Sequence, residues 1–126
     1  MVSVLVVDDE SGARTMLAMA LRGADMRVET VADGNQALDM VKRRAFDWIV
    51  SDIRLPGIDG VSLAREIARI RPDTNIILIS AVASDDDVQR LPIKAFWRKP
   101  FDPLALQQFI MNAQHPRDTK KAHLVR

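Results

Sequence analysis

Five side chains suited to phosphate and metal chemistry follow apolar runs of the chain. They are three carboxylates, one hydroxyl and one ammonium: Asp8, Asp9, Asp52, Ser80 and Lys99. Two carboxylates about 4 Å apart repel each other by roughly 4 kcal/mol at an effective dielectric constant near 20. Three carboxylates in one place therefore need a counter-ion, and an all-oxygen cluster without sulfur suits a hard cation such as Mg²⁺.

Each of these groups has a use in phosphoryl transfer. A carboxylate can attack phosphorus and form an aspartyl phosphate. Lys99 offers a point charge for one phosphoryl oxygen, and Ser80 can donate a hydrogen bond to another. Phosphoryl transfer needs mainly positioning and charge neutralisation, which a metal ion and an ammonium supply. Taken singly, each residue could also be a helix cap or a surface charge, so their joint position decides the interpretation.

Apolar periodicity predicts five strands that alternate with five helices. The expected strands cover residues 2–7, 27–31, 46–51, 75–79 and 93–97. The expected helices begin with side chains that can cap them, at Ser11, Asp33, Asp59, Ser84 and Asp102. This alternation favours a parallel sheet with helices on both faces. Ligands of such sheets bind beyond the carboxyl ends of the strands, where the five reactive residues would gather.

Composition indicates one soluble domain. The chain has 126 residues, of which 48% are hydrophobic and 28% charged. The absence of cysteine excludes disulfides, thiolate metal sites and cysteine nucleophiles. A net charge of +1 indicates neither nucleic acid nor membrane as a partner. No apolar run approaches the roughly 20 residues of a membrane span, so we expect a cytoplasmic protein. The domain should cover residues 1–113, and residues 114–126 should form a flexible basic tail.

Four segments together resemble a known family. They are Val4-Leu5-Val6-Val7-Asp8-Asp9-Glu10, Asp52-Ile53-Arg54-Leu55-Pro56-Gly57-Ile58-Asp59-Gly60, Ser80-Ala81 and Lys99-Pro100-Phe101. In this order, from residue 4 to residue 101, they are similar to the motifs of response-regulator receiver domains of two-component signalling. The resemblance implies a doubly wound (βα)5, flavodoxin-like α/β fold with strand order 2-1-3-4-5.

The resemblance also implies a metal and phosphate site. Asp52 matches the phosphoacceptor and Asp9 a direct Mg²⁺ ligand. Asp8 matches the neighbouring acid, which acts through a metal-bound water, and the backbone carbonyl of Arg54 matches a further ligand. Lys99 matches the lysine that contacts phosphate, and its bond to the following proline is usually cis in the family.

Two residues match the family's switch. Ser80 corresponds to the hydroxyl that turns toward the phosphoryl group, and Phe96 to the aromatic side chain that follows it. Phosphorylation adds roughly −1.5 to −2 charges and would alter the face formed by the fourth helix, fifth strand and fifth helix. The implied phosphodonor is a histidine kinase or a histidine phosphotransfer protein. The implied output partner is unknown, the chain would not bind nucleic acid directly, and it would be a monomer or weak homodimer.

The chain departs from the family pattern around its fifth strand. The stretch between Ser80 and Lys99 is a few residues short, because Pro92 ends the fourth helix early. Trp97 and Arg98 stand where smaller apolar residues are usual. The side chain of Arg54 should border the site, and we expect it to alter dephosphorylation by steering or blocking water.

Two other classes of function remain open at this stage. A Mg²⁺-dependent phosphohydrolase could use an aspartate nucleophile, although the chain has no cap domain to enclose a substrate. A phosphorylation-independent interaction module could have the same fold, although the complete acidic set disfavours it. A flavin- or nucleotide-binding protein is less favoured, because no glycine-rich loop follows the first strand. The receiver could be stand-alone or part of a longer regulator.

Overall fold

The computed structural model describes residues 1–82 and 88–114 and contains one parallel sheet. Its strands are β1 (Ser3–Val7), β2 (Arg27–Val31), β3 (Trp48–Asp52), β4 (Asn75–Ser80) and β5 (Ala95–Arg98). Their order is β2-β1-β3-β4-β5. This confirms the strand order that the resemblance implies, and it places β1 and β3 side by side in the middle.

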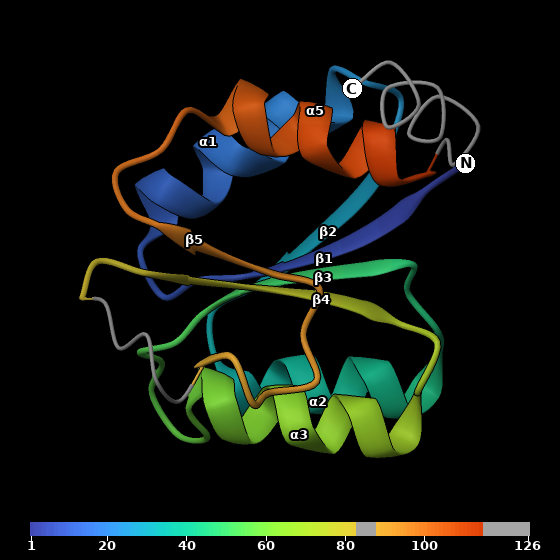
Figure 1. Ribbon diagram of the computed structural model, residues 1–126, viewed down its shortest axis with the longest axis vertical. Helices are drawn as coiled ribbons and strands as arrows, with labels where there is room; N and C mark the ends of the chain where they lie inside the picture. The colour runs from blue at the N-terminus through green and yellow to red at the C-terminus, as the bar shows by residue number, and fades with distance from the viewer. Residues whose placement is uncertain (83–87, 115–126) are drawn as a thin grey trace.

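Helices cover both faces of the sheet (Figure 1). On one face lie α1 (Ser11–Arg22) and α5 (Pro103–Gln114), and on the other lie α2 (Gly34–Arg43) and α3 (Gly60–Ile70). Residues 84–87 of the predicted helix that begins at Ser84 lie outside the described residues. The same holds for residues 115–126 of the predicted tail, whose first residue, Gln114, ends α5.

Alternate residues of each central strand enter two separate cores. Val4 and Val6 of β1 pack on the side of α1 and α5, whereas Leu5 and Val7 pack on the side of α2 and α3. All four side chains are at most 1% exposed. Strands buried on both faces read as continuous apolar runs, which explains the valine-rich start of the chain. The sheet therefore forms a rigid platform for whatever follows the strand ends.

Aspartate side chains begin three of the helices as the sequence predicts. Asp33, Asp59 and Asp102 each accept a backbone N–H from the first turn of the helix that follows. The prediction that Ser11 caps a helix is wrong. Ser11 is the first residue of α1, and the preceding Glu10 is the N-cap without a side-chain hydrogen bond.

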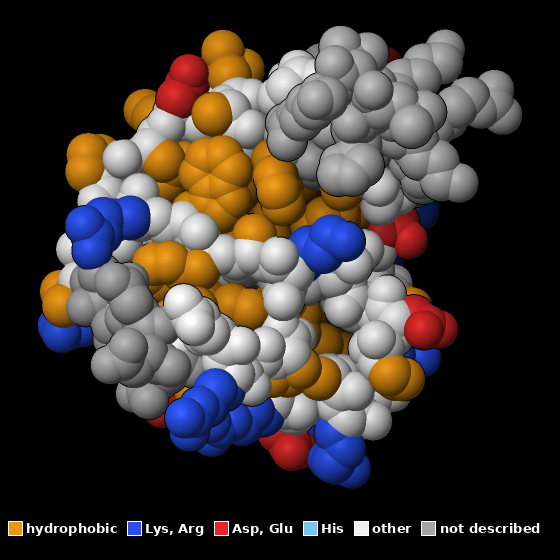
Figure 2. Space-filling view, in the orientation of Figure 1, with side chains coloured by type: hydrophobic (Ala, Val, Ile, Leu, Met, Phe, Trp, Pro, Cys, Tyr) orange, Lys and Arg blue, Asp and Glu red, His pale blue; other side chains and the backbone are white. Residues whose placement is uncertain are grey.

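Four aromatic rings form a row between the sheet and α5, here called the aromatic row: Phe101, Trp97, Phe109 and Trp48. Successive ring centroids are 5.6, 5.8 and 6.2 Å apart, all edge to face. The indole N–H of the fully buried Trp48 donates to the side-chain oxygen of Gln114 at 2.7 Å. Figure 2 shows hydrophobic side chains reaching the surface in this region of β5 and α5. The aromatic row thus runs from the loop after β5 to the last residue of α5.

No helix within the two described stretches of the chain is long and apolar enough to cross a membrane.

Candidate functional site

Three carboxylates meet at the carboxyl ends of β1 and β3. Val7 pairs with Ser51 in the sheet, so Asp8 and Asp9 after β1 lie beside Asp52 at the end of β3. One oxygen from each carboxylate lies within 4.8 Å of the others. Asp8 is buried, Asp52 is partly buried and Asp9 is exposed. These three residues, here called the acidic cluster, form the group that the sequence predicts at this edge.

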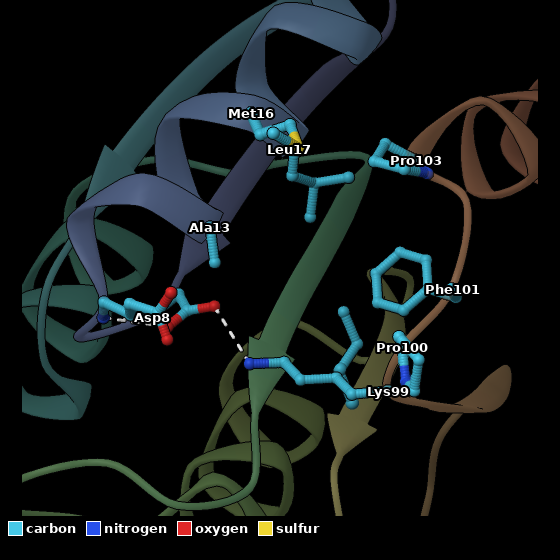
Figure 3. Close-up of a pocket in the computed structure, with 10 residues that line it drawn as sticks. Asp8, Ala13, Met16, Leu17, Lys99, Pro100, Phe101 and Pro103 are labelled. Atoms are coloured by element: carbon cyan, nitrogen blue, oxygen red, sulfur yellow. Dashed lines mark hydrogen bonds and ion pairs between the residues drawn. The ribbon is translucent and has the colours of Figure 1, made fainter.

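Lys99 reaches the acidic cluster from the end of β5. Its Nζ lies 2.9 Å from Oδ2 of Asp52 and 3.4 Å from Oδ2 of Asp8. Figure 3 shows the Lys99 side chain extending from the loop after β5 toward Asp8. The backbone holds this loop in place, because the N–H of Lys99 donates to the carbonyl of Ser80 at 2.9 Å. The Lys99–Pro100 peptide bond is cis, as the resemblance implies.

The surroundings shift the pKa values of the central pair. Burial raises the pKa of Asp52 above 3.8, and the charges of Asp8 and Asp9 act in the same direction against the opposing effect of Lys99. Burial alone would lower the pKa of Lys99. The hydrogen bond and charge of Asp52, together with Asp8, outweigh burial and raise that pKa above 10.5. The Lys99 ammonium thus lies close to two of the three carboxylates, and together with the acidic cluster it forms a group with an excess of negative charge.

The acidic cluster fits a hard divalent cation. All of its donors are carboxylate oxygens, which Mg²⁺ prefers over nitrogen and sulfur. Two oxygens on one Mg²⁺ lie at most about 4.2 Å apart, given Mg–O distances near 2.1 Å. The present limit of 4.8 Å is only slightly larger, so small side-chain movements are sufficient to close the site.

Gly60 fixes the loop after Asp52, a role that was not predicted from the sequence. A Cβ on Gly60 would lie 2.3 Å from the backbone oxygen of Asp52 and 2.7 Å from Cα of Ile53. The N–H of Gly60 also donates to the carbonyl of Ile53 at 2.8 Å. The available signal was a glycine directly after the helix-capping Asp59, where a helix gains nothing from it. Only glycine lets the start of α3 approach Asp52 this closely.

The other predicted residues lie nearby but make different contacts. Ser80 is buried at the end of β4, and its hydroxyl donates to the carbonyl of Val82 at 2.7 Å rather than to the acidic cluster. Phe96 is partly buried and packs on the core beneath α2 and α3. Arg54 is exposed in the loop after Asp52. The structure thus joins Asp8, Asp9, Asp52 and Lys99, and it holds the Ser80 hydroxyl in a different contact.

A pocket of about 230 Å³ opens beside the acidic cluster, between α1 and the loop after β5. Figure 3 shows Met16 and Leu17 of α1 on one side of the pocket and Phe101 on the other. Asp8 and Lys99 also line it. A mostly apolar opening thus lies beside Asp8 and Lys99.

Known proteins share both the sequence pattern and the fold. Residues 4–111 match the response regulator receiver domain. The transcriptional regulator NtrC of Klebsiella pneumoniae is 36% identical over 99 residues, which cover 79% of this chain and 20% of NtrC. The regulatory protein ZraR of Salmonella typhimurium is 32% identical over 122 residues, which cover 94% of this chain and 28% of ZraR. The chain thus spans less than a third of the length of these relatives.

Two similar solved structures contain magnesium. One is the receiver domain of sensor histidine kinase PA1611 from Pseudomonas aeruginosa, which has a magnesium ion coordinated in its active site cleft. Its TM-score to this chain is 0.78 and its sequence identity is 32%. The match covers 87% of this chain and 94% of the PA1611 domain. TrrA from Thermotoga maritima, in complex with Mg²⁺ and BeF, has a TM-score of 0.80 and 30% identity, covering 89% and 98%. With the family match over residues 4–111, the strand order and the acidic cluster in hand, the chain belongs to the response regulator receiver domains of two-component systems.

Proposed function

We propose that this receiver domain accepts a phosphoryl group on Asp52 from a histidine kinase or a histidine phosphotransfer protein. The observation that carries the proposal is the acidic cluster, with Nζ of Lys99 2.9 Å from Oδ2 of Asp52. Magnesium in the cleft of the PA1611 receiver and the Mg²⁺–BeF complex of TrrA support the same use of this site. The protein would be a signalling phosphoacceptor with modest self-catalysed phosphorylation and dephosphorylation, and not a metabolic enzyme.

The proposed Mg²⁺ ligands are the carboxylates of Asp9 and Asp52, the backbone carbonyl of Arg54, and Asp8 through a water molecule. Bound Mg²⁺ would supply positive charge for the phosphoryl oxygens. Lys99 would supply the second positive charge, because its ammonium already reaches the Asp52 carboxylate. Together, the Mg²⁺ ion and the Lys99 ammonium would satisfy the main electrostatic demand of the reaction.

The chemical step is nucleophilic attack by the Asp52 carboxylate. One carboxylate oxygen forms a bond to phosphorus while the phosphorus–nitrogen bond of the donor phosphohistidine breaks. The bonding electron pair leaves with the imidazole nitrogen, and an aspartyl phosphate results. Asp52 must be ionised to attack, so its raised pKa requires a pH above the folded-state value.

The proposed switch begins with Ser80. Its hydroxyl would leave the carbonyl of Val82 and donate to a phosphoryl oxygen instead. The side chain of Phe96 would follow and change the face formed by the fourth helix, β5 and α5. The phosphoryl group can shift this equilibrium only by the difference between its interactions with the two states.

The proposed setting follows from the phosphodonor. Histidine kinases and phosphotransfer proteins present phosphohistidine in the cytoplasm, so we place this domain there. The related NtrC and ZraR are described as transcriptional regulators, whereas this chain would pass its signal to a partner without contacting nucleic acid itself. We propose that it does so as a monomer or a weak homodimer.

Incubation with acetyl phosphate and Mg²⁺, followed by intact mass measurement, tests the proposal. The wild-type chain should gain one phosphoryl group, and D52N should gain none. Chelation of Mg²⁺ should abolish the adduct on the wild type. An adduct on both proteins or on neither would contradict the assignment, and steady turnover of a phosphomonoester would favour a phosphohydrolase.

A further inference from the structure

Arg14 of α1 holds the peptide unit between Asp8 and Asp9. Its Nη1 donates to the backbone carbonyl of Asp8 at 2.7 Å. That carbonyl belongs to the peptide group that links the two acidic residues, so its direction fixes ψ of Asp8 and φ of Asp9 together. A guanidinium hydrogen bond is charge-assisted and stronger than a neutral one.

Asp9 depends on this peptide more than Asp8 does. The Asp8 carboxylate has its own partners, since Oδ1 accepts from the N–H of Glu10 at 2.9 Å and Oδ2 lies 3.4 Å from Nζ of Lys99. The exposed carboxylate of Asp9 makes no hydrogen bond or ion pair within residues 1–82 and 88–114. The position of its Cα–Cβ bond relative to the acidic cluster therefore depends on the backbone, to which Arg14 is hydrogen-bonded.

The position of Arg14 is unfavourable for helix stability. Arg14 is the fourth residue of α1, whose first turn contains no acidic residue and whose N-cap makes no side-chain hydrogen bond. A cation near a helix N-terminus opposes the helix dipole, at a cost of about 0.3–1 kcal/mol. A residue that breaks a local rule is expected where a functional site requires it. The bond to Asp8 gives Arg14 such a reason.

We propose that Arg14 is a positioning residue that orients Asp9 for Mg²⁺ through the Asp8–Asp9 peptide. The inference rests on the proposed function, because it assumes that the acidic cluster binds Mg²⁺. A positioning role and a purely electrostatic role of Arg14 predict opposite changes in Mg²⁺ affinity. The Arg14 guanidinium repels a divalent cation, so a purely electrostatic role predicts tighter Mg²⁺ binding once it is removed. A positioning role predicts weaker binding.

The test measures the thermal unfolding midpoint over a series of Mg²⁺ concentrations. Stabilisation by a ligand that binds only the folded state follows RT ln(1 + [L]/Kd), which gives Kd separately from the metal-free midpoint. We expect R14M to raise the Kd for Mg²⁺ about tenfold, the lower range seen when a residue supporting a metal ligand is lost. A purely structural role would lower the metal-free midpoint and leave Kd unchanged.

R22M is the matched control. Arg22 is the last residue of the same helix and lies more than one turn beyond Arg14. Its Nη2 donates to the backbone carbonyl of Val28 at 2.8 Å. R22M should keep the wild-type Kd even if its metal-free midpoint falls. In a D9N background, R14M should no longer change the Kd, because Asp9 is the residue through which Arg14 acts.

The outcomes separate the two proposals. If the wild type shows no Mg²⁺-dependent stabilisation, the proposed function and this inference both fail. If the wild type binds Mg²⁺ and R14M binds it equally or more tightly, only the positioning role is overturned. An equal loss of affinity in R22M, or an undiminished effect of R14M in D9N, would overturn it as well.

Discussion

The ionised carboxylate of Asp52 costs the fold stability before any ligand binds. Burial and the neighbouring Asp8 and Asp9 raise its pKa above 3.8 despite Lys99. A group whose pKa is raised on folding stabilises the fold below its unfolded pKa, and this contribution is lost as pH rises through the folded pKa. Metal-free D52N should therefore unfold at a higher temperature than the wild type at neutral pH.

Wild type and D52N, compared at different pH values, also test the sign of the stability difference. Below pH 3.8 Asp52 is protonated in both the folded and the unfolded wild type, so the advantage of D52N should shrink in acid. Urea unfolding midpoints measured from acid to neutral pH provide the comparison. A D52N variant that is less stable than the wild type at neutral pH would contradict the pKa argument.

Arg54 gives a second prediction for a single residue. Its exposed side chain lies two residues beyond Asp52, and we expect it to restrict the approach of water to an aspartyl phosphate. R54A should then lose its phosphoryl group several-fold faster than the wild type, measured as the decay of the phosphorylated mass after acetyl phosphate is removed. Equal half-lives of the phosphorylated wild type and R54A would show that Arg54 does not affect dephosphorylation.

Among the elements, β3 and the start of α3 approach each other closely at Gly60. In G60A the new Cβ would lie 2.3 Å from the Asp52 backbone oxygen, a contact with backbone that α3 relieves only by moving away. We expect a loss of more than about 2 kcal/mol in unfolding free energy, as overpacking of a tight contact produces. Urea denaturation provides the measurement, and phosphorylation of the folded fraction should also slow.

G12A is the matched glycine control. A Cβ on Gly12 of α1 meets no atom within 4 Å, so only helix propensity changes. G12A should leave stability unchanged or raise it by about 0.5–1 kcal/mol. If G60A and G12A were equally stable, the close approach of α3 to Asp52 would not affect the free energy of unfolding.

The sequence predicts the gathering of the acidic cluster for a simple reason. Parallel strands end at one edge of the sheet, so residues directly after β1 and β3 must become neighbours once the strands are assigned. The segments around Val4 and Ile77 are apolar on both faces, a pattern that predicts central strands of a parallel sheet. Helix starts at Asp33 and Asp59 were equally predictable, since their capping depends only on the next few residues.

Contacts that depend on competing local partners could not be predicted. Ser80 could donate toward the acidic cluster or toward nearby backbone, and the carbonyl of Val82 is its partner. Ser11 does not cap α1, because the preceding turn is organised by the Asp8 carboxylate, which accepts from the N–H of Glu10. The close approach at Gly60 depends on the path of the whole loop, which no local pattern encodes.

For the whole molecule, the aromatic row offers an internal reporter of the switch. Trp97 and Trp48 are the only tryptophans of the chain. The Trp97 ring lies 5.6 Å from that of Phe101, two residues beyond Lys99. If Lys99 moves to contact a phosphoryl-like group, the surroundings of Trp97 change with it. Tryptophan emission should therefore change when Mg²⁺ and beryllium fluoride are added.

Two variants show which tryptophan causes the change in emission. W48F should retain it, because Trp97 and its neighbour Phe101 remain in place. W97F should lose it, because the fully buried Trp48 lies at the far end of the aromatic row. An undiminished change in W97F would show that the response does not pass through the loop after β5.

The most direct test of the account locates the phosphoryl group chemically. Borohydride reduces an aspartyl phosphate to homoserine, and tandem mass spectrometry then identifies the modified position. After incubation with Mg²⁺ and acetyl phosphate, we expect homoserine at position 52, and none when Mg²⁺ is chelated. Homoserine at another aspartate, or phosphate that withstands borohydride on a serine hydroxyl, would contradict this expectation.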